Sequence, residues 1–376
     1  MSDSLPKIAL AAVLKPIDDT RMYEKFALTL CTAYEVHIIG FETSQPLTPQ
    51  KNIHFHPLFQ FTRQGNKRLG ASKQLLHQLT AIQPDLLIIH AVELLPAACW
   101  YAWRHRIPLC YDVRENYWRN IIYQRNYSTV FKWPLAIGIR LLERLSRLVV
   151  QHYFLAEQCY ATEFNFTHGK HTVLENKFKP LNPLPISKSK KKNELQFVYT
   201  GTISKIYGAQ EAFNLMEKLR NSGLKLHFTM IGKVAQQALG NWLAQRAQRC
   251  PWFTWSGNSQ PVPHPQILEA LHNADYALLP YQPNLSTINC IPTKMYECLA
   301  LAIPMVVQEN ELWKSICTPH QAAVFIDFPT AQIETLKNQL LQGAYYPNGP
   351  VATAFWEGAT LLDIVHALLH PTHHTS

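Results

Sequence analysis

Short apolar runs alternate with helix-like segments along most of this chain, on both sides of one proline- and lysine-rich segment. Before that segment, the pattern predicts strands at 7–14, 35–40, 85–90, 108–113 and 171–175. Helices are predicted at 21–31 and 67–81, with a long helical or mixed stretch at 135–158. Strands that alternate with helices are typical of parallel sheets covered on both faces.

The same alternation follows the proline- and lysine-rich segment, with strands predicted at 195–200, 225–231, 275–280 and 304–308 and helices at 208–222, 265–273, 293–302 and 359–369. The segment itself, 179–193, combines three prolines with a lysine run and has no periodicity, which is typical of a linker. We therefore predict an α/β chain with two Rossmann-like parallel-sheet domains, at 1–178 and 194–354, facing each other across a cleft. A C-terminal helix and tail at 355–376 is expected to pack back toward the first domain.

The charge balance of the chain is basic, since 35 Lys and Arg against 26 Asp and Glu give a formal net charge of +9. Such an excess favours anionic partners, which include nucleic acid, phosphorylated small molecules and an anionic membrane surface. The chain carries no recognised nucleic-acid motif, so we expect no nucleic acid partner, and a nucleic-acid-binding module stays a rival interpretation.

The cysteines, histidines and apolar segments indicate the compartment. The eight cysteines are scattered without a C-x-x-C pair, which fits a reducing cytosol. The N-terminus lacks the cationic region of a signal peptide. The longest apolar region, 85–103, is interrupted by His90, Glu93 and Pro96, whereas a membrane span needs roughly 20 mostly apolar residues. We expect a cytoplasmic protein, with peripheral contact to the inner face of the plasma membrane left open. The 17 histidines are spread out, and we expect no metal site.

The segment around Lys294 carries the most chemical information. Pro292 and Thr293 open a predicted helix, and the free backbone amides of such an end bind anions. Lys294 stands in the first turn, where the helix dipole disfavours a cation unless an anion is bound. Glu297 follows one turn later, and a carboxylate there can accept two hydrogen bonds from the vicinal hydroxyls of a ribose. The alternative is an ordinary surface ion pair between Lys294 and Glu297.

A second segment, 197–208, has the sequence FVYTGTISKIYG. A predicted buried strand ends at Gly201, and Gly208 stands near the start of the next helix. Backbone amides in such a loop can contact a diphosphate. The spacing matches neither a P-loop nor the dinucleotide motif G-x-G-x-x-G, and an ordinary α/β turn with two glycines remains the alternative.

These segments together resemble the retaining glycosyltransferases of the GT-B fold, specifically the large family 4-like group, also called group 1. The resemblance rests on Tyr-Thr-Gly at 199–201, Tyr-Gly at 207–208, ADYALLPY at 274–281, IPTKMYECLA at 291–300 and Trp-Glu at 356–357. It implies a hexosyltransferase-type enzyme of polysaccharide biosynthesis that needs no bound metal or other cofactor. Such an enzyme moves a sugar from a nucleotide-diphosphate sugar to a glycan or lipid-linked acceptor, with retention of configuration.

By this resemblance, Glu297 matches the glutamate that holds the ribose of the donor. Asn289 stands where family members often have a second glutamate near the transferred sugar, and Thr202 and Tyr207 stand where they often have Arg and Lys. The donor-binding set is then Gly201, Thr202, Lys205, Pro292, Thr293, Lys294 and Glu297, with Lys205 or Lys294 supplying the positive charge. These departures keep two rivals open: a non-catalytic glycosyltransferase-like partner subunit, and a GT-B sugar-nucleotide epimerase or hydrolase.

Two segments of the first half are expected to supply acceptor-side and catalytic residues. The segment PLCYDVRENYW at 108–118 is similar to the family's Tyr-Asp-x-His-Glu, with Arg114 where His is common. Arg114 and Glu115, together with Asn289, are the catalytic candidates. Asp112 is an acceptor-side candidate, although these residues can equally form a structural ion-pair cluster. Asp19 and Arg21, in the loop after the first strand, are further acceptor-side candidates, and helix capping is the favoured alternative for Asp19.

Basic and aromatic residues interleave through 117–147, which suits an anionic membrane interface. The alternative is an amphipathic helix with a solvated basic face. The histidine-rich C-terminal tail is interpreted as disordered.

Overall fold

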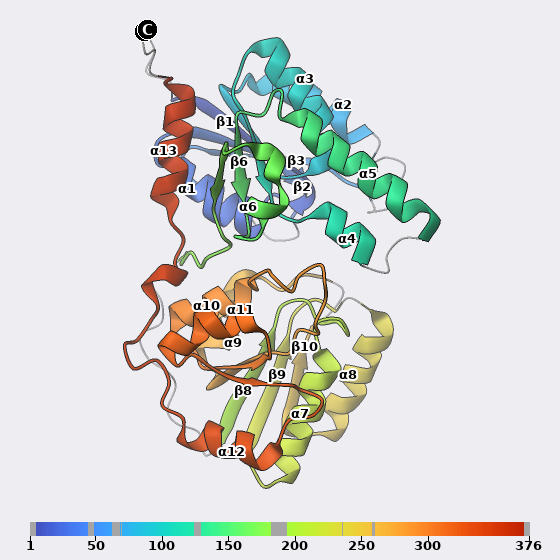
Figure 1. Ribbon diagram of the computed structural model, residues 1–376, viewed down its shortest axis with the longest axis vertical. Helices are drawn as coiled ribbons and strands as arrows, with labels where there is room; N and C mark the ends of the chain where they lie inside the picture. The colour runs from blue at the N-terminus through green and yellow to red at the C-terminus, as the bar shows by residue number, and fades with distance from the viewer. Residues whose placement is uncertain are drawn as a thin grey trace. The chain divides into compact units, whose positions relative to one another are not determined.

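The computed structural model describes residues 5–43, 49–61, 68, 70–123, 129–181, 194–234, 236–257 and 260–371. Most of the predicted linker and the last five residues of the tail therefore lie outside the described residues. The chain divides into two compact units. Unit 1 joins Met1–Lys179 to Trp356–Ser376, and unit 2 is Pro180–Phe355 (Figure 1).

Unit 1 contains a seven-stranded parallel sheet in the order β3-β2-β1-β4-β5-β6-β7. Its strands are β1 Lys7–Pro16, β2 Glu35–Phe41, β3 Ile53–Phe59, β4 Leu86–Ile89, β5 Leu109–Val113, β6 His152–Leu155 and β7 His171–Val173. Its helices are η1 Thr20–Ala27, α1 Leu28–Leu30, α2 Ala71–Ile82, η3 Val92–Leu94, α3 Leu95–His105, α4 Tyr117–Tyr123, α5 Thr129–Ser146, α6 Tyr160–Glu163, η4 Asn165–Thr167 and α13 Gly358–Leu369.

The core of unit 1 includes side chains from the far C-terminal end of the chain. Leu361 and Val365 of α13 are fully buried in the same cluster as Ile8 and Phe26. The ring of Trp356 lies 5.8 Å from that of Phe26, and α13 runs beside α1 (Figure 1). Leu361 and Val365 are four positions apart, so they lie on the same face of α13, and that face packs against the core.

Unit 2 contains a six-stranded parallel sheet in the order β10-β9-β8-β11-β12-β13. Its strands are β8 Leu195–Thr200, β9 Leu226–Ile231, β10 Phe253–Ser256, β11 Tyr276–Leu279, β12 Met305–Gln308 and β13 Ala323–Ile326. Its helices are α7 Ala209–Asn221, α8 Gln237–Arg249, α9 His264–His272, α10 Thr293–Leu301, α11 Glu311–Cys317, η5 Thr318–His320, α12 Ile333–Gln342 and η6 Ala352–Ala354. The predicted α/β class with two Rossmann-like parallel-sheet domains is confirmed.

Four strands were not predicted as separate elements: β3, β6, β10 and β13. Strand β6 lies inside the stretch expected to be helical or mixed, where α5 ends at Ser146. The first predicted helix begins as a π-helix, Thr20–Ala27, and only its last turn, Leu28–Leu30, is α-helical. Among the described helices, none is long and apolar enough to cross a membrane.

Candidate functional site

Three glycines of unit 2 follow neighbouring parallel strands and bring their carboxyl ends into close contact. A side-chain carbon on Gly232 would stand 1.7 Å from the carbonyl oxygen of Gly201, and one on Gly257 would stand 2.3 Å from that of Gly232. Both distances are far below van der Waals contact, so only glycine fits. The three glycines thus pack the ends of these strands together at the edge where ligands of open α/β sheets bind, with Gly201 and Gly257 partly exposed and Gly232 buried.

The loop after Gly201 is held in one shape by internal contacts. The Tyr199 hydroxyl lies 3.1 Å from the carbonyl oxygen of Thr202 and 3.2 Å from that of Tyr207, and donates to them. At Gly208, the N-cap residue of α7, a side-chain carbon would stand 1.9 Å from the carbonyl oxygen of Pro280. Within this ordered loop, Thr202 and Lys205 are exposed.

The first turn of α10 brings the second predicted segment to the same place. Pro292 is the N-cap residue, and the Lys294 side chain extends so that its Cε would stand 3.4 Å from a Cβ on Gly201. The Lys294 Nζ lies 2.8 Å and 3.0 Å from the two carboxylate oxygens of Glu297. The structure therefore joins the β8 strand end, the lysine and the glutamate in one site.

The ion pair of this site is not the ordinary surface pair that the sequence left open. Glu297 is only 2% exposed, and His264 Nε2 lies 3.3 Å from its Oε1. Burial acts to raise the pKa of Glu297, but the charge of Lys294 and the contact with His264 outweigh it and lower the pKa to about 2. Glu297 is therefore an ionised acceptor near neutral pH, beside a lysine whose side chain keeps 18% of its surface exposed.

Asn289 lies in the loop before α10 and is exposed. The two residues beside it are held through their carbonyl oxygens. Asn310 Nδ2 donates to Ile288 at 2.9 Å, and Trp313 Nε1 donates to Cys290 at 2.8 Å. The Asn289 side chain is thus presented to solvent from a fixed backbone.

In unit 1, Arg21 and Asp112 form a buried ion pair. Arg21 is 1% exposed, and its Nε and Nη2 lie 2.8 Å and 2.6 Å from the two carboxylate oxygens of Asp112, which is fully buried. His90 Nδ1 lies 2.7 Å from the same carboxylate. Although burial opposes ionisation, Arg21 and His90 hold the pKa of Asp112 well below its usual range. This cluster matches the structural alternative, because neither acceptor-side candidate presents its side chain to solvent.

Asp19 and Arg114 form a second pair of unit 1. Asp19 accepts hydrogen bonds from the backbone amides of Arg21 and Met22, as a helix cap does, and its Oδ1 lies 2.7 Å from Arg114 Nη2. Burial raises the pKa of Asp19, but Arg114 and Lys15 outweigh that effect and lower it to about 2. Glu115 is about half exposed and accepts from Asn120 Nδ2 at 3.0 Å. Arg114 and Glu115 thus directly follow β5, and Glu115 is much the more exposed of the two.

Sequence reasoning missed both histidines that contact these carboxylates. His90 and Asp112 follow one another in the sheet at the ends of β4 and β5, and His264 opens α9, which is 33 residues before Glu297. No local pattern marks such contacts. The only usable signal for His90 is its position directly after a buried strand, at the same edge as Asp112.

Comparisons with known proteins identify the fold. No protein-family model matches the chain, and no curated protein sequence matches it. Among solved structures, a sucrose-phosphate synthase from Thermosynechococcus elongatus is similar, with a TM-score of 0.68 and 11% identity over 96% of this chain and 99% of that one. Anabaena HepE in complex with UDP and glucose has a TM-score of 0.62 and 12% identity, over 96% of this chain and 99% of that one. The catalytic domain of Arabidopsis thaliana starch synthase IV, bound to ADP and acarbose, has a TM-score of 0.60 and 11% identity over 98% of this chain and 100% of that one.

These similarities run over nearly the whole length of each chain. The chain therefore has the GT-B fold, and its structural neighbours include glycosyltransferases.

Proposed function

We propose that the protein is a retaining glycosyltransferase, similar to family 4, that transfers a sugar from a nucleotide-diphosphate sugar to a hydroxyl of a glycan or lipid-linked acceptor. One observation carries the proposal: Lys294 stretches from the first turn of α10 to the Gly201 strand end while it pairs with the ionised Glu297. A helix start, a lysine and a buried carboxylate together suit a ligand that carries both a phosphate and vicinal hydroxyls.

The donor's diphosphate is the group that this arrangement stabilises. As the bond from the sugar carbon to the diphosphate breaks, negative charge develops on the departing oxygen, and the acceptor hydroxyl bonds to that carbon and gives up its proton to the departing phosphate. In this proposal, the amides at Thr293 and Lys294 and the ammonium groups of Lys294 and Lys205 would meet that charge. Glu297 would accept hydrogen bonds from the ribose.

Unit 1 would contribute the acceptor side. We assign contact with the acceptor to Arg114 and Glu115, because Glu115 is about half exposed and Arg114 has a buried Nη1 without a hydrogen-bond partner among the described residues. Arg21 and Asp112 are then positioning residues, since their buried pair joins the first turn of η1 to the end of β5. An unpaired guanidinium nitrogen suits an anionic or hydroxyl-rich acceptor.

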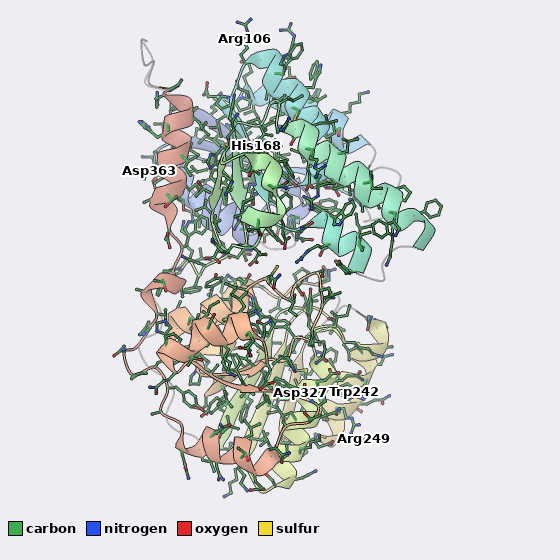
Figure 2. All side chains as sticks on the ribbon, in the orientation of Figure 1. Arg106, His168, Trp242, Arg249, Asp327 and Asp363 are labelled. Atoms are coloured by element: carbon green, nitrogen blue, oxygen red, sulfur yellow. The ribbon has the colours of Figure 1, made fainter. Side chains whose placement is uncertain are left out.

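A surface of unit 1 supports the lipid-linked acceptor and an anionic bilayer as partner. Helices α3 and α5 contact each other, and with Leu148, just after α5, they expose a set of large apolar side chains: Trp100, Trp103, Phe131, Trp133, Ile137, Leu141, Leu145 and Leu148. The same helices also carry exposed cations, including Arg104 and Arg144, and the exposed Arg106, which is labelled in Figure 2, directly follows α3. The one acidic residue of these two helices, Glu143, is buried. Apolar side chains among cations, without exposed acids, suit an anionic lipid surface.

The donor site is tested by a thermal-shift series with UDP, GDP, ADP and CMP and their sugar conjugates. Several structural neighbours were solved with UDP or ADP, so these nucleotides come first. We expect one nucleotide to raise the melting temperature, because a ligand that binds only the folded state stabilises it. Transfer is then measured with the selected labelled donor and anionic vesicles that carry a polyprenyl-linked glycan.

The other outcomes separate the rival functions. Donor binding without transfer, restored by a partner enzyme, would favour a non-catalytic subunit, for which Thr202, Tyr207 and Asn289 are the motivating departures. Turnover of the donor without any acceptor would favour an epimerase or hydrolase. No shift with any nucleotide would overturn the assignment of unit 2 as the donor domain.

A further inference from the structure

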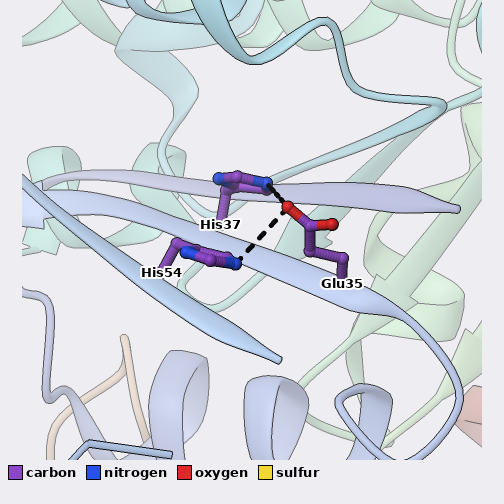
Figure 3. A group of neighbouring side chains, drawn as sticks. All are labelled: Glu35, His37 and His54. Carbon is purple, nitrogen blue, oxygen red and sulfur yellow. Dashed lines mark hydrogen bonds and ion pairs between the residues drawn. The ribbon is translucent and has the colours of Figure 1, made fainter. Parts of the chain in front are cut away.

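Three side chains of unit 1 that could ligate a metal converge on the face shared by β2 and its neighbour, the edge strand β3. Glu35 and His37 stand two residues apart on β2, and His54 on β3 is the register partner of His37. Because side chains alternate along a strand, all three point to the same face of the sheet. Figure 3 shows both imidazole rings directed at one carboxylate oxygen. The sequence predicted no metal site, since only the register of β2 and β3 brings His54 to Glu35 and His37.

The distances fit a small cation. The ligand atoms of the three residues all lie within 4.8 Å of one another. Glu35 Oε1 lies 3.0 Å from His37 Nε2 and 3.4 Å from His54 Nε2. Ligands at about 2.0–2.1 Å from a tetrahedral zinc are separated by roughly 3.3 Å. The donor set of two imidazoles and one carboxylate is also one that zinc accepts.

The second partner of His37 holds the ring in place. His37 Nδ1 lies 3.0 Å from His56 Nε2, and His56 Nδ1 lies 3.0 Å from Gln78 Nε2 on α2. If each neutral ring carries its proton on Nδ1 rather than Nε2, His37 Nδ1 donates to His56 and its Nε2 lone pair becomes available to a cation. Gln78 accepts from His56 through its amide oxygen after a flip of the amide.

We propose that Glu35, His37 and His54 bind a divalent transition-metal ion, with Zn²⁺ as the first candidate and His56 as the residue that positions His37. The two ligand rings stack at 4.8 Å with an angle of 19° between them, so binding requires them to tilt toward one point. His54 is about half exposed and has room to turn. A water molecule would complete the coordination.

The site is separate from the residues proposed for transfer. Glu35 begins β2 and His54 is the second residue of β3, so the cluster lies at the amino ends of the strands. Asp112 lies near the carboxyl end of β5, and Asp19 and Arg114 follow the carboxyl ends of β1 and β5 in the same sheet. The metal would therefore have a structural role: it would link β3 directly to β2, and through His56 it would be connected to α2. Loss of the metal is expected to leave nucleotide binding by unit 2 unchanged.

The test is metal titration of the full-length protein without a polyhistidine tag, after removal of metal with a chelator. Every protein carries His373→Gln and His374→Gln, so that the tail histidines add no sites. Calorimetry with Zn²⁺ gives the stoichiometry, and visible absorption of Co²⁺ reports a tetrahedral site with nitrogen and oxygen ligands. The decisive variant is His54→Gln, because His54 is exposed enough to be replaced without loss of the core. The matched control is His77→Gln, an exposed histidine on α2.

We expect one equivalent of Zn²⁺ to be lost in His54→Gln and in Glu35→Gln and to remain in His77→Gln. His56→Gln should weaken binding about 10–100-fold, as loss of an outer-shell partner does. Zn²⁺ should also raise the melting temperature of the control but not of His54→Gln. Equal stoichiometry in His54→Gln and His77→Gln, or binding only at millimolar Zn²⁺, would overturn the proposal and leave the cluster as a hydrogen-bonded network. Melting of the metal-free variants checks that each one is folded.

Discussion

Each unit contains a cluster in which a buried carboxylate lies beside a cation and an imidazole. In unit 1 these are Asp112, Arg21 and His90, and in unit 2 they are Glu297, Lys294 and His264. Both carboxylates are almost fully buried, and both have a pKa lowered by the neighbouring cation against the effect of burial.

The difference between the two clusters is the cation. Arg21 is itself buried, and its remaining hydrogen bonds go to the carbonyl oxygen of Leu174 and to Asn176 Oδ1. Lys294 is partly exposed and stands in the first turn of a helix. The buried Arg21 guanidinium cannot give up a hydrogen-bond partner without a large cost in free energy. The partly exposed Lys294 ammonium can share its N–H donors with an incoming anion. The same three kinds of group therefore form a structural ion-pair cluster in unit 1 and a candidate ligand site in unit 2.

The largest expected effect is on stability, from Asp112→Asn. This change removes the charge that compensates a buried arginine, and such losses cost about 3–5 kcal/mol. Urea unfolding of the whole chain, followed by fluorescence and circular dichroism, measures it. Glu357→Gln, at an exposed carboxylate of the same unit, is the control and should change stability far less. Equal effects of the two substitutions would show that the Arg21–Asp112 pair contributes no more to stability than an exposed carboxylate does.

Glu297→Ala should act chiefly on donor binding. We expect at least about a tenfold loss of affinity for the selected nucleotide sugar, which corresponds to about 1.4 kcal/mol. The fold should be retained with a smaller loss of stability than in Asp112→Asn, because Lys294 can turn toward water. Calorimetry measures the affinity, and Glu269→Ala, at an exposed position on α9, is the control. Unchanged affinity would remove Glu297 from the donor site.

The pH dependence of stability separates Glu297 from an ordinary surface carboxylate. Its folded pKa, about 2, lies below the usual 4.5, so its stabilising contribution is full above pH 4.5 and is lost as the pH falls toward 2. The stability difference between the wild type and Glu297→Gln should therefore be up to about 3 kcal/mol at pH 6 and should shrink steadily below pH 4.5. Melting curves between pH 2.5 and 6 follow this trend, and a constant difference would contradict it.

The smallest expected effect is at Glu115. Its contact with Lys15 is 3.9 Å long and exposed on both sides, so Glu115→Ala should change stability by less than about 1 kcal/mol. If Glu115 contacts the acceptor, the same substitution should lower transfer while donor affinity stays unchanged. Lys15→Ala is the matched control, since it breaks the same pair from the other side. An equal loss of transfer in both variants would assign the effect to the ion pair.

Sequence reasoning reached the elements whose local pattern is strong. Strand β8 occupies the predicted range, Leu195–Thr200, because a run of apolar residues ends at a glycine. Strand β3 was missed because its histidines and Pro57 interrupt the apolar pattern at the edge of the sheet. Strand β10 was missed because it is four residues long and half exposed.

The candidate site was predictable only where one segment carries the whole feature. Lys294 and Glu297 are three residues apart on one helix, so their proximity follows from helical geometry. The contact of Lys294 with Gly201 joins residues 93 positions apart, and it depends on the order of strands in the sheet. The burial of Arg21 has the same cause, since its partners lie 91 and 153 positions away.

The inclusion of α13 in the core of unit 1 has a consequence for synthesis of the protein. Unit 2 is one continuous piece of chain, and all of it leaves the ribosome before Leu361 and Val365 are available to the first sheet. The unit whose sequence starts first therefore finishes folding last, and its apolar surface around Phe26 stays uncovered while the second unit is made. A chain that ends at residue 355 and is tethered to the ribosome through a linker long enough to fill the exit tunnel should carry a folded unit 2 and an incomplete unit 1.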